Sequence, residues 1–325
     1  MRATEKVPVV PEILRQHVEG AAFLWEQRAR MFYDPAMDER QIGRTDFRIS
    51  AHLDACLASG SKALEEAERR FDDFQDAGET FSWLATSVLG HAAGLDHVLE
   101  RIAQAELDAL RGASGAIAWV GSDALKPYVS HWAKSTVPFK RWLALTAFSA
   151  YRVNPGALMD RYLDDPVDQV RARALRLVGE IGLSERMNDL RAMLDGPEDF
   201  GIRYFSARSL ALLGDREAAR PVLQDIASGD SEYADAALEL VILVMPLADL
   251  LPWMGTLIQK PDRRDAAIEI AGAIRHPSIL DWLLNKAKVP DCAAAVTRAL
   301  RNALPFNLDH TDVLESETDL LPEGL

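Results

Sequence analysis

The stretch RARALRLVGEIG, residues 171–182, places alanine and leucine on one side of a helix and ends in glycine. Alanine and leucine favour the helix, and apolar residues three or four positions apart form a single face. We expect its arginines on the opposite, solvated side. Similar stretches recur as SARSLALLG at 206–214, DAALELVI at 235–242 and DAAIEIAG at 265–272. Residues 171–182 are therefore one copy of a recurring helix.

The recurrence extends over most of the chain. Aligning the central position of each copy gives Thr86, Ile117, Leu145, Leu175, Leu210, Leu238, Ile268 and Val296. By subtraction, the gaps between neighbours are 31, 28, 30, 35, 28, 30 and 28 residues. A spacing near 30 fits two short helices and two turns. This regularity favours helical repeats over an ordinary helical bundle whose helices are similar by coincidence.

A second amphipathic helix is expected after each of the first seven copies. These helices are expected at 95–102, 125–132, 157–163, 188–194, 219–226, 247–254 and 277–284. Asp and Ser in the intervening turns suit helix N-caps, and alanines let neighbouring helices approach closely. Gly179, Gly214 and Gly272 are expected to end first helices in the left-handed conformation.

Residues 1–79 break this period. They predict one long helix at 7–32 and two more within 44–71, joined near Gly60. The first repeat of a solenoid needs an atypical cap over its apolar face. We therefore predict three parts. They are a helical N-terminal cap at 1–79, a repeat solenoid at 80–308, and an acidic C-terminal tail at 309–325 that holds six acids and no Lys or Arg.

Two segments carry resemblances to known families. DPVDQVRARALRLVGEIG, residues 165–182, resembles the short HEAT-like repeat that is also found in phycobilisome lyases. This resemblance implies an all-α, right-handed α-solenoid of about eight two-helix repeats. ILRQHVEGAAFLWEQR at 13–28, followed by RTDFRISAHLDAC at 44–56, resembles a HEAT-like family encoded beside type VI secretion effectors. That resemblance implies a role with a secreted toxin, as its immunity protein or as an adaptor that loads it.

Composition restricts the class of partner and the compartment. The formal charge of −14 disfavours direct nucleic-acid binding and favours a basic protein partner, although solubility alone explains many acidic chains.

Cys56 and Cys292 are too few for a disulfide framework or a four-thiolate zinc site. The N-terminus lacks the apolar core of a signal peptide. The most apolar stretch, 234–255, is interrupted by charges and prolines, so it predicts two buried helices that meet at a proline. We expect a cytoplasmic protein with no membrane contact.

Motifs for catalysis are missing from the sequence. It contains no phosphate-binding loop, dinucleotide fingerprint, HExxH or GxSxG motif. His17 and His52 each lie near a carboxylate on a predicted helix, but no third ligand has suitable spacing, which favours a hydrogen bond between cap helices. We predict no catalytic residue, metal or cofactor. Two enzymatic alternatives are a DNA glycosylase and a lyase, since both occur among HEAT-like solenoids. A DNA glycosylase needs a cationic channel, which the acidic turns disfavour. A lyase needs a cysteine or pocket that accepts a bilin, and the sequence does not identify one.

A solenoid exposes an extended concave surface, usually lined by its second helices. Trp253 and Trp282 lie 29 residues apart at matching places on two such helices and suit interface anchors, although packing between repeats is an equally simple role. The acidic residues of the turns are Asp164, Asp165, Asp168, Asp195, Glu198, Asp199, Asp230 and Glu232. We expect them along one ridge that meets a basic effector toxin, the alternative being helix capping and solubility. The predicted function is a non-enzymatic immunity protein that covers the toxin's active site, with an adaptor as the alternative.

Overall fold

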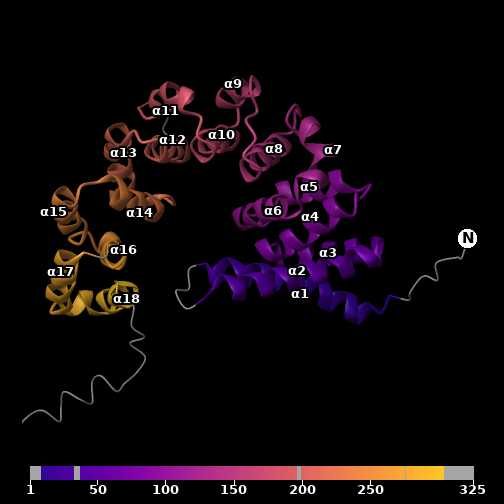
Figure 1. Ribbon diagram of the computed structural model, residues 1–325, viewed down its shortest axis with the longest axis horizontal. Helices are drawn as coiled ribbons and strands as arrows, with labels where there is room; N and C mark the ends of the chain where they lie inside the picture. The colour runs from indigo at the N-terminus through magenta and orange to yellow at the C-terminus, as the bar shows by residue number, and fades with distance from the viewer. Residues whose placement is uncertain (1–8, 33–36, 196–198, 275, 304–325) are drawn as a thin grey trace, which may run out of the picture. The chain divides into compact units, whose positions relative to one another are not determined.

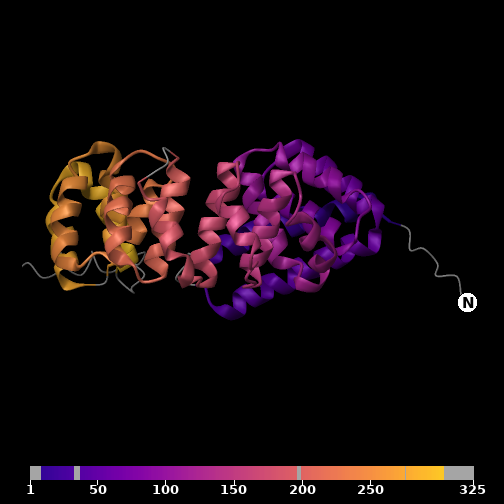
Figure 2. The same cartoon turned by 90° about the horizontal axis from the view of Figure 1, so that it is seen from above.

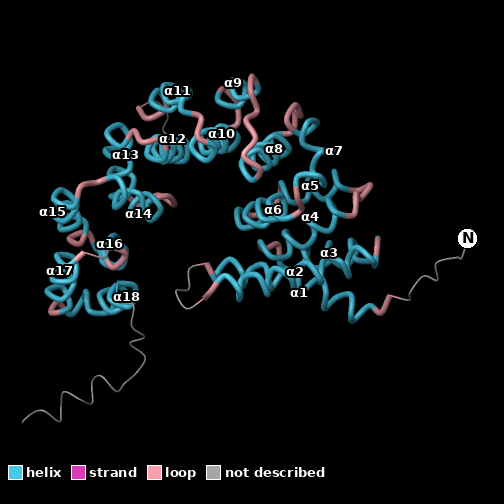
Figure 3. Tube along the Cα trace, viewed as in Figure 1, coloured by secondary structure: helices cyan, strands magenta, loops and turns pink. Residues whose placement is uncertain are grey.

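The computed structural model describes residues 9–32, 37–195, 199–274 and 276–303 (Figure 1). Over these residues the chain forms 18 α-helices and two short 3-10 helices, and no strand (Figure 3). The helices pack in neighbouring pairs, which confirms the predicted all-α solenoid. The chain divides into two compact units, Met1–Ile181 and Gly182–Leu325, and each is described by itself.

The first unit holds ten helices among its described residues. They are α1 (Pro11–Met31), α2 (Glu39–Ser59), α3 (Ser61–Phe74), α4 (Ala77–Leu89), α5 (Leu95–Ala103), α6 (Leu107–Trp119), α7 (Ser122–Trp132), α8 (Pro138–Ala150), α9 (Leu158–Leu163) and α10 (Asp168–Ile181). The first three belong to the predicted cap, and the predicted repeats begin with α4.

The helices of the second unit run side by side (Figure 2). They are η1 (Ser184–Arg186), α11 (Met187–Ala192), α12 (Phe200–Leu212), α13 (Arg216–Ser228), α14 (Ala234–Val244), α15 (Leu247–Leu257), α16 (Pro261–Ala271), α17 (Pro277–Ala287), η2 (Pro290–Cys292) and α18 (Ala293–Ala303). Helices α14 and α15 flank Pro246, as the apolar stretch predicts. None of the helices in the described part of the chain is long and apolar enough to cross a bilayer.

The predicted repeat is confirmed helix by helix. The eight aligned central positions fall on the even-numbered helices α4 to α18, and all eight side chains are buried. The seven expected second helices correspond to the odd-numbered helices α5 to α17. Within each unit, every even-numbered helix packs against the next one. Small residues permit this packing, since Ala174, Ala207, Ala237 and Ala267 are all inaccessible to solvent.

The glycine predictions hold at one position of three. Gly214 follows α12 with φ +95°, as a left-handed helix end requires. The prediction is wrong for Gly272, which has φ −60° and serves close packing instead, because a Cβ there would lie 2.2 Å from the Ala299 carbonyl oxygen. It is also wrong for Gly179, which lies inside α10, and Gly182 takes the positive φ (+79°) after that helix.

The arginines of residues 171–182 are not all solvated, which corrects a second prediction. Arg173 is 8% exposed and donates to Thr146 Oγ1 at 3.2 Å and to Glu180 Oε2 at 3.0 Å. Arg171 donates to the Asp165 carbonyl oxygen at 3.1 Å. Of these three arginines, only Arg176 is exposed. A spacing pattern cannot separate these cases, because a long arginine stem reaches buried acceptors from the edge of a helix.

Arg171 is one of four arginines that connect the first helix of a repeat to the chain segment before it by hydrogen bonds. Their guanidinium groups donate to carbonyl oxygens just after the preceding helix: Arg141 to Ser135 and Thr136, Arg171 to Asp165, Arg203 to Leu194 and Arg264 to Ile258. The C-terminal end of a helix carries partial negative charge on unpaired carbonyls. The arginines thus satisfy these acceptors and connect successive helices.

The cap helices cover the first repeat. Helix α1 packs against α2, α3 and α4, and Trp25 of α1 stacks on Phe81 of α4 with ring centroids 4.9 Å apart. Gly60 joins α2 to α3 with φ +61°, as expected. The limits 1–79, 80–308 and 309–325 stay predictions, and the acidic tail at 309–325 lies outside the described residues.

Candidate protein-interaction sites

The three predicted acidic residues of the first unit differ in accessibility. Asp164 is exposed after α9, and Asp168 is exposed and paired with Arg171. Asp165, by contrast, is 2% exposed and accepts two hydrogen bonds from Arg141, at 2.7 and 2.8 Å. It also accepts one from the Val167 amide at 3.0 Å. The carboxylate of Asp165 is used inside the fold, so we leave it out of the candidate binding surface.

The predicted acidic site residues of the second unit lie mostly at its surface. Asp195, Asp230 and Glu232 are exposed. Asp199 is half-buried and accepts from the Ile202 amide at 2.9 Å, which caps α12. Glu198 lies outside the described residues. The expected ridge joins residues of both units, so it stays a prediction.

The two tryptophans occupy equivalent places on α15 and α17. Both side chains are half-buried. The residue after each one, Met254 or Leu283, is inaccessible to solvent. The Lys286 ammonium lies 5.8 Å from the centroid of the Trp282 ring. Each ring therefore borders the buried stripe of its helix and is partly exposed, and its use as an interface anchor stays a prediction.

His17 and His52 form the interhelical contact that the cap sequence favours. Their Nδ1 atoms are 3.1 Å apart, between α1 and α2. Gly20 makes room for the His52 ring, because a Cβ at Gly20 would lie 2.5 Å from His52 Cε1. Burial lowers the pKa of His52, with further contributions from His17 and Arg48. The described residues contain no group of three or more potential metal ligands, and the pair connects α1 to α2.

A cavity of about 650 Å³ lies between α1, α3 and α4, and the sequence did not point to it. Glu19, Phe23 and Glu26 line it from α1, Arg70 and Phe74 from α3, and Glu79 from α4. The three α1 residues are spaced four and three apart, so they share one face of that helix. An apolar residue on an otherwise polar helix face, such as Phe23, is the signal that could have indicated the cavity.

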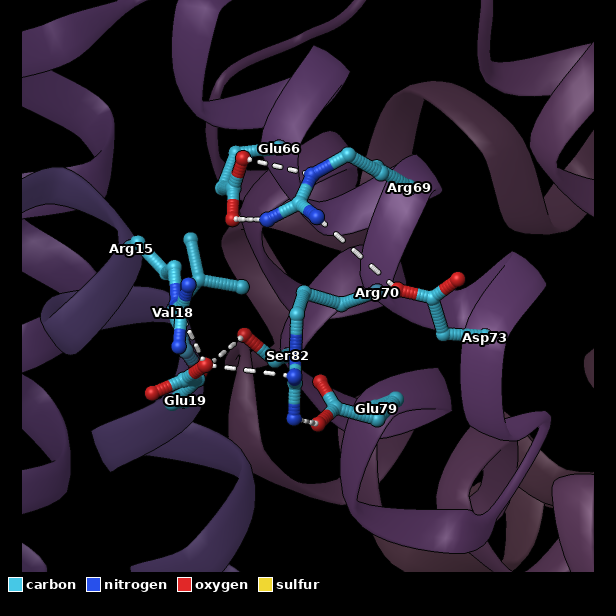
Figure 4. A network of polar contacts seen from close by, with 9 residues as sticks. All are labelled: Arg15, Val18, Glu19, Glu66, Arg69, Arg70, Asp73, Glu79 and Ser82. Atoms are coloured by element: carbon cyan, nitrogen blue, oxygen red, sulfur yellow. Dashed lines mark hydrogen bonds and ion pairs between the residues drawn. The ribbon is translucent and has the colours of Figure 1, made fainter. Parts of the chain in front are cut away.

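One guanidinium serves two carboxylates in this cavity (Figure 4). Arg70 lies 3.1 Å from Glu19 Oε1 and 2.7 Å from Glu79 Oε1. Glu79 is 5% exposed, and its Oε2 lacks a hydrogen-bond partner in the described part of the chain, as does Arg70 Nε. Burial raises the pKa of Glu79, opposed by the hydrogen bond from Arg70.

The local fold explains why Glu79 sits there. Asp76 caps α4 by accepting from the Glu79 amide at 2.9 Å, which fixes Glu79 in the first turn. At Gly78 a Cβ would lie 2.9 Å from the Ala22 carbonyl oxygen, so the start of α4 packs closely on α1. Glu79 therefore enters the space between the helices and is removed from water.

We expect Glu79→Gln to remove part of the pH dependence of stability. The folded-state pKa of Glu79 is raised above its ordinary 4.5, so the folded state binds the proton more tightly than the unfolded state. The contribution of Glu79 to the free energy of unfolding therefore falls as the pH rises from about 4.5 through the raised pKa. Urea unfolding of both proteins between pH 4 and 7 should show Glu79→Gln gaining relative to the parent as the pH rises. A difference that is constant with pH would contradict this assignment.

Comparison with known proteins gives one finding. A family model described as HEAT repeats matches residues 155–242, the segment from the approach to α9 into α14. No curated protein and no solved structure matches the chain significantly. The match supports a HEAT-like repeat protein, and HEAT repeats generally mediate protein–protein interaction.

Proposed function

We propose that the chain is a non-enzymatic, protein-binding solenoid that neutralises a type VI secretion toxin by covering the toxin's active site. The observation that carries the protein-binding part is the HEAT-repeat match over residues 155–242. Stacked repeats offer extended surfaces to other proteins. The toxin as partner rests on the resemblance of residues 13–28 and 44–56 to the family encoded beside secretion effectors.

The charge of the chain supports a basic partner. The formal charge is −14, and Asp195, Asp230 and Glu232 lie exposed in turns of the second unit. Complementary charges accelerate encounter and fix orientation. A toxin that acts on nucleic acid carries a basic active site, and an acidic surface placed over it would exclude the substrate.

The test is deletion of the gene for this chain in a producer that also encodes the adjacent effector. Intoxication of the deletion strain by its sisters, relieved by restoring the chain, is the expected result. A healthy deletion strain that no longer delivers the effector would instead assign the adaptor role. If neither growth nor delivery changes, the proposal fails.

We further expect neutralisation of three exposed acids to weaken partner binding. The variant combines Asp195→Asn, Asp230→Asn and Glu232→Gln, which keep the side-chain size and remove three charges. At low salt the affinity for the purified effector should fall about tenfold, by removal of long-range attraction, and its salt dependence should become shallower. The control combines Asp54→Asn, Glu65→Gln and Glu100→Gln, also exposed but in the first unit. Equal loss in both variants would show a net-charge effect and no role for these turns.

A further inference from the structure

We propose that the cavity between α1, α3 and α4 is a socket for an arginine side chain carried by a partner protein. The inference rests on the proposed protein-binding function and adds a site and a chemistry to it. The cavity volume of about 650 Å³ lies in the range of pockets that hold small ligands, so a guanidinium and its stem fit inside.

The ion pairs around the cavity leave its buried carboxylate, Glu79, short of a cation. Glu19 contacts Arg15 at 2.8 Å as well as Arg70, and Glu26 contacts Arg111 at 2.5 Å. Among the described residues, Glu79 pairs with Arg70 alone, the guanidinium that Glu19 also uses. A carboxylate that is 95% removed from solvent and shares this cation with a second carboxylate is under-compensated. A second guanidinium would complete the arrangement.

The unpartnered atoms specify a polypeptide and not a bare cation. Glu79 Oε2 needs a donor and Arg70 Nε needs an acceptor, and both are buried without one in the described structure. Leaving such groups unsatisfied costs free energy. An arginine within a polypeptide carries both complements, because its guanidinium N–H groups suit Oε2 and a backbone carbonyl suits Nε. A metal ion would serve only the carboxylate.

The aromatic lining suits the same side chain. Phe23 is 66% exposed and Phe74 is 54% exposed, although both line the cavity. Guanidinium groups stack on aromatic faces, and Arg70 already does so, with its Cζ 4.2 Å from the Phe74 centroid. Glu79 Oε2 and Arg70 Nε are buried, so binding requires the exposed Phe74 ring to turn away from Arg70 and admit the incoming group.

The test uses the full chain and the capped peptide acetyl-Leu-Arg-Leu-amide, with a citrulline peptide as the neutral counterpart. NMR titration follows the methyl group of Ala22, which lines the cavity. The arginine peptide should shift this signal saturably and bind at least about tenfold more tightly than the citrulline peptide, as loss of a charged hydrogen bond predicts. Equal affinities, or no shift at Ala22, would overturn the socket.

Two variants locate the binding. Glu79→Gln keeps the side-chain volume and should weaken the arginine peptide about tenfold. Glu65→Gln makes the same change at an exposed position of α3 and should leave the affinity unchanged. Circular dichroism checks that both variants are folded. If Glu79→Gln binds the peptide as the parent does, Glu79 is not the acceptor and the socket is refuted.

Titration with free arginine distinguishes a site for an arginine side chain of a protein from a site for a small molecule. It carries the same guanidinium but no peptide flanks, so it should bind more weakly than the peptide. Equal or tighter binding of free arginine would make this a metabolite site and overturn the partner assignment. Peptide titration needs no effector, so the socket can fail while the deletion experiment still supports the proposed function, and the reverse also holds.

Discussion

Replacing Arg141 by methionine is expected to lower the free energy of unfolding by about 3–5 kcal/mol. The side chain is 4% exposed and meets Asp165, which is 2% exposed, through two hydrogen bonds. Methionine keeps an apolar stem but leaves the Asp165 carboxylate buried with one amide donor, from Val167. It also frees the carbonyl oxygens of Ser135 and Thr136. Urea unfolding measures the loss, and hydrogen exchange should rise in α8 to α10.

Two further variants test whether the buried charge of Asp165 causes the loss of stability. Lys126→Met breaks a pair whose side chains are 75% and 89% exposed, and it should leave the unfolding midpoint unchanged within error, because solvent screens such pairs. Adding Asp165→Asn to Arg141→Met removes the uncompensated charge and should recover part of the lost stability. A double variant no more stable than Arg141→Met would contradict the role given to the buried charge.

The repeat architecture could be predicted because its signal is local. A helix face needs apolar residues three or four positions apart, and a period near 30 residues recurs without knowledge of any distant contact. This pattern predicts Leu175 and Leu210 on the apolar helix face, and both are buried. The same logic located α14 and α15 on either side of Pro246.

Contacts between distant residues could not be predicted in this way. Arg70 meets Glu19, 51 positions earlier in the chain, only because of the way α1 and α3 pack. Asp165 appeared in the sequence as one more turn acid, and its pairing with Arg141 depends on the position of α8 relative to α9. Charge patterning indicates where acids occur, but burial decides which of them remain available to a partner.

The role of a glycine within a helix also depends on contacts with distant residues. An interior glycine costs helix stability, so the sequence suggests helix ends or weak points. Gly272 instead lies opposite the Ala299 backbone, a contact that exists only after α16 and α18 have packed. A positive φ can be predicted from the local sequence. A glycine whose missing Cβ makes room for another helix cannot be recognised in that way.

Gly112→Ala should be among the most damaging single-methyl changes in the described chain, at about 3 kcal/mol or more of lost stability. A Cβ there would lie 2.1 Å from the Ala77 carbonyl oxygen and 2.8 Å from Thr80 Cβ. Because the first obstacle is backbone, no rotamer change relieves it, and α4 and α6 must separate. The Ala77 amide also donates to Asp108 Oδ2 at 3.0 Å across this contact, and that bond would lengthen.

Gly43→Ala provides the matched control. Gly43 lies within α2 on an exposed face, and a Cβ there would meet nothing within 4 Å. It should therefore gain about 0.5–1 kcal/mol from helix propensity, the opposite sign from the same substitution at Gly112. Urea unfolding of both variants decides this, and an equal loss of stability in both would contradict the steric explanation given for Gly112.

The Gly112 variant also links packing to the proposed socket. Ala77, which the new methyl group displaces, lies two residues before Glu79 in the first turn of α4. If that turn moves, Glu79 leaves its place beside Arg70, and the arginine peptide should bind less tightly although no cavity residue has changed. Gly43→Ala leaves α4 untouched and should bind the peptide as the parent does. Unchanged peptide affinity in a destabilised Gly112→Ala would show that the socket does not depend on how closely α4 and α6 pack.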